Sequence, residues 1–113
     1  MATEKQIKSA LARWVKLLED PEIAEEFDDY NKTLQFEFPD MGLKLQLVIE
    51  NCKGKILDGE NKKAEMGLTI NSDLFMGIAT GAEDPMELFM NGEFKIKGNM
   101  SDLERLRIFM DEG

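Results

Sequence analysis

Residues 33–50, TLQFEFPDMGLKLQLVIE, are the stretch that decides the fold class of this chain. On both sides of a Pro-Asp-Met-Gly turn at residues 39–42, every second residue is apolar. A period of two is typical of strands with one buried face, because successive side chains of a strand point to opposite faces of the sheet. The stretch therefore predicts a β-hairpin with strands at residues 33–38 and 43–50.

Three more strands are expected further along the chain. Residues 55–57 and 64–70 follow short turns and also have strand character, so the hairpin extends into a four-strand antiparallel meander over residues 32–71. A fifth strand is expected around Phe94 and Ile96. The helical segment before it has about the length of a crossover connection, so we expect the fifth strand to lie parallel to a neighbour.

Helical spacing of apolar residues appears at both ends of the chain. Residues 1–31 are expected to form two N-terminal helices, and residues 72–113 two short helices, the fifth strand and a final helix. Side chains that can cap a helix precede these segments, at Thr3, Asp20, Ser72, Asp84 and Ser101. The pattern predicts an α+β fold: a five-stranded, largely antiparallel mixed sheet with helices covering one face.

The composition fits one small domain without imidazole chemistry. The chain has 113 residues, close to the common size of a single domain, and we assign residues 1–113 to one domain. It contains no histidine, which excludes Ser-His-Asp and Cys-His relays and imidazole metal ligands. Cys52 is the single cysteine, so no intrachain disulfide can form. We expect no catalytic residue, no metal and no cofactor.

The charge argues against nucleic acid as a partner. There are 23 Asp and Glu residues against 14 Lys and Arg residues, and the resulting formal charge of −9 would repel a phosphate backbone. No apolar run approaches the roughly 20 residues that span a bilayer. Residues 1–6 lack the apolar core of a secretory signal, so a cytoplasmic location is expected.

An ordered set of short motifs lies between residues 62 and 100. The most distinctive is Gly92-Glu93-Phe94-Lys95-Ile96-Lys97-Gly98-Asn99-Met100, which reads as G-x-x-K-I-x-G-N-M. The others are Lys62-Lys63-Ala64, Leu68-Thr69-Ile70, Ser72-Asp73-Leu74, Asp84-Pro85, Leu88-Phe89 and Asn91-Gly92. In this order and spacing the set resembles the sterol carrier protein 2 family, the SCP2-like lipid-binding domains. After Met100 the sequence departs from the family, because residues 101–105 are more charged than usual.

The resemblance implies an apolar tunnel between the sheet and the C-terminal helices, which holds a fatty acid, a sterol or a similar lipid without catalysis. Of the eight methionines, six lie at or after residue 66, and the unbranched Met side chain adapts to irregular apolar shapes. We therefore expect a small soluble lipid-binding or lipid-transfer protein. The expected lipid-binding residues are Phe75, Ile78, Met86, Phe89, Met90, Met100, Leu103, Leu106, Phe109 and Met110.

Alternative interpretations stay open at the level of sequence. Met and Phe at helical spacing also fill ordinary cores, and Lys95 and Lys97 could either meet a ligand carboxylate or protect an edge strand. A second candidate function is a non-catalytic interaction or accessory module with a filled core, whose acidic helix over Glu22–Asp29 docks a basic partner. Transient membrane contact, a protein partner and a homodimer are further alternatives.

Overall fold

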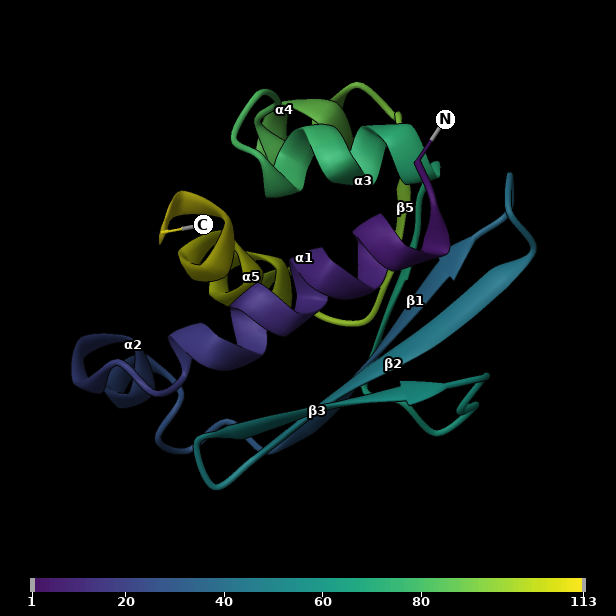
Figure 1. Cartoon of the computed structure of the whole chain (residues 1–113). Helices are drawn as coiled ribbons and strands as arrows, with labels where there is room; N and C mark the ends of the chain where they lie inside the picture. The colour runs from purple at the N-terminus through teal and green to yellow at the C-terminus, as the bar shows by residue number, and fades with distance from the viewer. Residues whose placement is uncertain (1, 113) are drawn as a thin grey trace.

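The computed structural model describes the backbone of residues 2–112 and the side chains of residues 2–109. In chain order, its elements are α1 (Glu4–Leu17), α2 (Pro21–Glu26), β1 (Lys32–Phe38), β2 (Leu43–Glu50), β3 (Lys53–Asp58), β4 (Met66–Thr69), α3 (Ser72–Ala79), α4 (Pro85–Met90), β5 (Lys95–Lys97) and α5 (Met100–Glu112). The expected α+β fold, a five-stranded mixed sheet with helices over one face, is confirmed (Figure 1).

The strands lie in the order β3-β2-β1-β4-β5. The pairs β1–β2, β2–β3 and β4–β5 are antiparallel, and β1–β4 is parallel. The expected four-strand meander over residues 32–71 is therefore wrong, because the chain leaves the sheet after β3 and returns on the other side of β1. The expected parallel pairing of the last strand is wrong for the same reason. The crossover comes before β4, and after α3 and α4 the chain returns as β5, antiparallel to β4.

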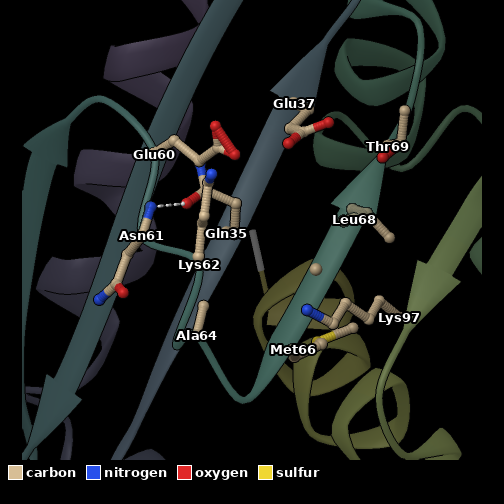
Figure 2. A pocket seen from close by; sticks show the side chains of 11 residues that line it. Gln35, Glu37, Glu60, Asn61, Lys62, Ala64, Met66, Leu68, Thr69 and Lys97 are labelled. Atoms are coloured by element: carbon tan, nitrogen blue, oxygen red, sulfur yellow. Dashed lines mark hydrogen bonds between the residues drawn. The ribbon is translucent and has the colours of Figure 1, made fainter.

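Residues 59–65 lead from β3 to β4, and we call them the crossing segment. A buried side chain holds this segment against the sheet. Gln35 on β1 is 6% exposed and lies on the face opposite the helices. Its Nε2 donates to the carbonyls of Leu45 and Gly59, each at 3.1 Å, and its Oε1 accepts from the backbone N–H of Asn61 at 2.6 Å (Figure 2). These bonds direct the chain across the sheet toward β4, which explains why residues 58–61 do not close a hairpin.

Side-chain caps set the starts of most helices. Three predicted caps are confirmed, each accepting a hydrogen bond from a backbone N–H in the first turn: Thr3, Asp20 and Asp84. Two are wrong. Asn71 caps α3, and its predicted cap, Ser72, instead donates its hydroxyl to Asp40 on the turn after β1. The last helix already begins at Met100, so Ser101 lies inside it.

Helix α2 is shorter than the acidic helix that the sequence indicated. It ends at Glu26, and Phe27 follows as the C-cap with its ring fully buried. Asp28 and Asp29 therefore lie in the turn after the helix and not on its face. Burial of Phe27 explains the early end, because the chain must turn there to place the ring in the core. Within residues 2–112, no helix combines the length and apolar character that crossing a membrane requires.

Candidate functional site

The ten residues expected to line a tunnel fall into different environments. Five of them are at most 1% exposed and belong to the hydrophobic core: Phe75, Ile78, Leu103, Leu106 and Phe109. Met86 and Phe89 are partly buried against that core. Met90 is 81% exposed and Met100 40% exposed. The side chain of Met110 lies outside the part of the chain whose side chains the structure describes.

The two exposed methionines lie at helix ends. Met90 is the last residue of α4 and Met100 the first of α5. Helix α4 has only six residues, less than two turns, and it buries Pro85 and Leu88 on one side. Met90 therefore points away from the core. The sequence pattern could not show this, because a helix this short has no repeated apolar stripe from which to read a face.

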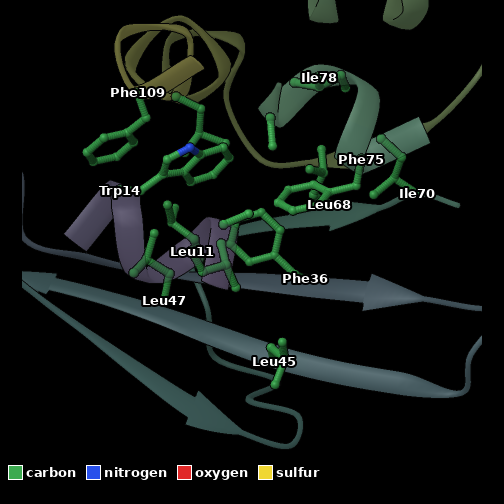
Figure 3. Packing of buried hydrophobic residues seen from close by; sticks show 14 of the residues in the cluster. Leu11, Trp14, Phe36, Leu45, Leu47, Leu68, Ile70, Phe75, Ile78 and Phe109 are labelled. Carbon is green, nitrogen blue, oxygen red and sulfur yellow. The ribbon is translucent and has the colours of Figure 1, made fainter. Parts of the chain in front are cut away.

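Two of the buried residues, Phe75 and Phe109, belong to a continuous row of aromatic rings. We call it the aromatic row: Tyr30, Phe27, Phe109, Trp14, Phe75, Phe36 and Phe38. Phe109 of α5 stacks on Phe27 at a centroid distance of 4.7 Å and on Trp14 of α1 at 5.5 Å, with 7° between the Trp14 and Phe109 planes. Trp14 also contacts Phe75 of α3 at 5.5 Å (Figure 3). The row joins three helices to the apolar face of the sheet.

One end of the aromatic row carries a buried carboxylate. Asp102, 1% exposed on α5, accepts hydrogen bonds from the hydroxyl of Tyr30 at 2.8 Å and from Nζ of Lys32 at 2.9 Å. Burial raises the pKa of the Tyr30 hydroxyl well above its ordinary value, and the hydrogen bond to Asp102 and its charge add to the effect. The cluster ties the start of α5 to the segment that joins α2 and β1.

Among the surface hollows formed by the described residues, three have volumes of about 400 Å³ each. One of them lies at the start of β1 and the end of β2 and is lined by residues 31–33, 48–51 and Glu65. Of the other two, the first lies on the face of the sheet opposite the helices, and both charged and apolar residues line it, among them Glu37, Glu60, Lys97, Ala64, Met66 and Leu68 (Figure 2). The second lies beside the turn between α3 and α4. It is lined by Ile78, residues 81–85, Glu87 and Arg107. Because charged side chains stand among its walls, the first hollow is a poorer site for an alkyl chain than a wholly apolar cavity would be.

The chain matches the family model described as the SCP-2 sterol transfer family over residues 9–111. It belongs to this family. Human sterol carrier protein 2 is 36% identical over 52 residues, which cover 46% of this chain and 10% of the human protein. The chain thus spans about a tenth of the length of the curated relatives it matches first.

Solved structures of SCP2 proteins share the fold. The UbiJ-SCP2 ubiquinone synthesis protein has a TM-score of 0.73 at 14% identity, covering 94% of this chain and 92% of that one. Palmitated SCP2L2 from Aedes aegypti has a TM-score of 0.68 at 14% identity, covering 97% and 95%. The family match over residues 9–111 confirms the resemblance to the SCP2 family that the sequence motifs indicated.

The SCP2 signature at residues 92–100 has a clear structural role in this member. Gly92 has φ +74° directly after α4. Gly98 has φ +114°, and a Cβ there would lie 2.7 Å from the carbonyl oxygen of Glu65. Asn99 precedes α5, and its carbonyl accepts from the N–H of Asp102. These residues fix the path of β5 between two helices, so the signature positions α5 over the sheet.

The sequence did not predict that the N-terminal segment contributes rings to the aromatic row. Trp14 and Phe27 occupy apolar positions within the two expected N-terminal helices. In the structure Trp14 contacts Phe75 and Phe109, and Phe27 contacts Phe109. Their apolar spacing predicted that they are buried. It carried no information on which distant helix they would meet.

Proposed function

We propose that this SCP2-family chain binds a lipid by its alkyl chain, between the sheet and helices α3 and α5, and carries it without chemical change in the cytoplasm. The observation that carries the proposal is the match to the SCP-2 sterol transfer family over residues 9–111. The aromatic row connects Phe75 and Phe109 of the expected site with Trp14. Palmitate on the Aedes neighbour supports an alkyl chain as ligand. The proposed site residues are the five buried ones together with Met86 and Phe89.

The rings of the aromatic row pack against one another, so an entering alkyl chain must part them. Helix α5 is the element proposed to move, because Leu103, Leu106 and Phe109 are its contacts with the core. Burial of each CH₂ group contributes about 0.8 kcal/mol. A twelve-carbon chain would therefore gain about 10 kcal/mol before the costs of association and of opening the core are subtracted.

A second candidate is a non-catalytic interaction module, and the close packing of the aromatic row favours it. The acidic surface available to a basic partner then comprises α2 and the turn after it, with Glu22, Glu25, Glu26, Asp28 and Asp29. Replacing Glu25 and Glu26 by Lys would abolish a salt-sensitive capture of such a partner. The same change would leave lipid binding intact, which separates the two candidates.

Trp14 provides the test of lipid binding, because it is the one tryptophan of the chain and lies within the aromatic row. We expect native mass spectrometry of the purified protein to show bound lipid. We also expect the Trp14 emission to shift when delipidated protein is titrated with dodecanol or dodecanoate. The Trp14→Phe variant is the matched control: it should keep the added mass and lose the optical signal. The proposal would be disproved if the purified protein had the mass of the polypeptide alone and if neither dodecanol nor dodecanoate shifted the Trp14 emission.

A further inference from the structure

We propose that the hollow beside the α3–α4 turn holds the head of the bound lipid, and that Arg107 donates there to an uncharged hydroxyl group. We call this site the turn hollow: Ile78, residues 81–85, Glu87 and Arg107, about 400 Å³ in volume. The inference rests on the proposed function and adds to it the class of ligand, a long-chain alcohol as opposed to a fatty acid.

Arg107 supplies a donor that lacks a partner. Its Nε is buried, and no group among the described residues accepts a hydrogen bond from it. Arg105, two residues earlier on α5, pairs with Asp29 at 3.9 Å, whereas no such pair engages Arg107 within residues 2–109. Buried donors are nearly always satisfied, so an orphaned one at the wall of a hollow points to an acceptor on a bound molecule.

The other walls of the turn hollow decide the charge of that molecule. Glu83, Asp84 and Glu87 line it together with Arg107, so its lining holds three acidic residues and one basic residue. A lipid carboxylate would be repelled by this excess of negative charge and by the formal charge of −9 on the chain. A hydroxyl oxygen can accept from Nε of Arg107 and donate its own proton to a carboxylate. The mixed lining therefore suits an alcohol.

The α3–α4 turn holds Glu83 in its place at the rim. The backbone N–H groups of Ala82 and Glu83 both donate to the carbonyl of Gly77, at 2.9 and 3.1 Å. A Cβ at Gly77 would lie 2.9 Å from Cγ of Glu83, so the absence of a side chain at Gly77 lets Glu83 lie against α3. The backbone and Cγ of Glu83 are thus placed against α3 by the fold.

Ile78 connects the turn hollow to the proposed tail site. Its side chain is 1% exposed, and it lines the hollow while also belonging to the hydrophobic core. On α5, Arg107 follows Leu106, which is buried in the same core. Figure 1 shows the α3–α4 turn beside the C-terminal part of α5. A head group at Arg107 therefore directs its alkyl chain past Ile78 toward the aromatic row.

The test is displacement of the uncharged dye Nile red by dodecanol and by dodecanoate at pH 8. We expect Arg107→Met to weaken dodecanol binding about tenfold, the effect of losing a hydrogen bond from a charged donor, and to leave Nile red binding unchanged. Arg13→Met is the control, because Arg13 is exposed on α1. We expect Glu83→Gln to strengthen dodecanoate binding about threefold or more, because one negative charge leaves the lining. If Arg107→Met does not fold, Arg107→Lys, which lacks Nε–H, replaces it.

Each result decides between the two proposals. Tighter binding of dodecanoate than of dodecanol to the unmodified protein, or dodecanol binding that is indifferent to Arg107, would overturn the hydroxyl site and leave lipid binding standing. Failure of the unmodified protein to bind Nile red, dodecanol and dodecanoate would overturn the proposed function itself, and the hydroxyl site with it.

Discussion

The two faces of the sheet are built from the same strands but from different chemistry. On the helix side, β1 and β2 present Leu34, Phe36, Phe38, Leu45, Leu47 and Ile49, each at most 1% exposed. On the opposite side they present mostly polar residues. The side-chain amide of the buried Gln35 forms hydrogen bonds with backbone groups of β2 and of the crossing segment. One face is closed by rings and aliphatic side chains, the other by hydrogen bonds.

This difference shows why size alone does not locate a lipid site. The hollow on the polar face has a volume of about 400 Å³, yet Glu37, Glu60 and Lys97 among its walls would leave part of an alkyl chain against charged groups. The helix side offers apolar walls, although side chains occupy them. An alkyl chain among apolar side chains leaves water without taking hydrogen-bond partners from polar groups, whereas charged walls would lose such partners.

Of the variants proposed, Phe109→Ala, on the helix side of the sheet, should lower the stability most. Phe109 is fully buried and stacks on both Trp14 and Phe27, so truncation should lower the free energy of unfolding by about 3–5 kcal/mol. Urea denaturation followed by Trp14 fluorescence measures the loss. Thr69→Ala, on the polar face, is the control and should cost less than about 0.5 kcal/mol. Similar losses for the two variants would contradict the proposed division of roles between the faces.

Asp102→Ala should have the next largest effect, at the polar end of the aromatic row. The change leaves the buried Tyr30 hydroxyl and the Lys32 ammonium without their shared acceptor, and we expect a loss of about 2–3 kcal/mol in the same denaturation experiment. Asp58→Ala is the comparison. Asp58 forms an exposed ion pair with Lys8 at 3.0 Å, and its removal should cost less than about 1 kcal/mol. Equal losses of unfolding free energy in the two variants would show that burial does not increase the contribution of Asp102 to stability.

Gln35→Leu should weaken the polar face by about 1–2 kcal/mol, because the carbonyl of Gly59 and the N–H of Asn61 lose their side-chain partner. Gln46→Leu is matched in chemistry, but its amide makes one long bond, 3.4 Å to the carbonyl of Asp58. We therefore expect a smaller loss there. Hydrogen exchange at Asn61 should accelerate in Gln35→Leu alone. Unchanged protection of that N–H would show that the amide does not hold the crossing segment.

Asp40→Asn should have the smallest effect, and a pH-dependent one. Hydrogen bonds from the hydroxyl and the N–H of Ser72 hold the pKa of Asp40 below its usual 3.8. A lowered folded-state pKa stabilises the fold above the unfolded value, and this contribution is lost as the pH falls through the folded value. The melting temperature of Asp40→Asn should be lower than that of the unmodified protein at pH 7. The gap should shrink below about pH 4. A constant gap would exclude the carboxylate charge as its cause.

Much of the fold could be predicted because its signals are local. Alternation at residues 33–50 depends only on the two faces of a strand, and the caps at Thr3, Asp20 and Asp84 satisfy N–H groups within their own first turn. The crossover before β4 was not predictable in this way. It depends on Gln35 meeting residues 59–61, and a Gln in an alternating strand looks like any solvent-facing position.

The residues of the candidate site were likewise only partly predictable from the sequence. Its apolar residues were identified from spacing, yet spacing did not separate the buried Phe75 and Phe109 from the exposed Met90 and Met100. The sequence by itself determined the element types, the family and the acidic, histidine-free chemistry. Only the tertiary structure decided that Trp14 and Phe27 meet the C-terminal helices and that the buried Nε of Arg107 has no acceptor among the described residues. Contacts between distant segments depend on how whole layers pack, and no short stretch of sequence encodes that packing.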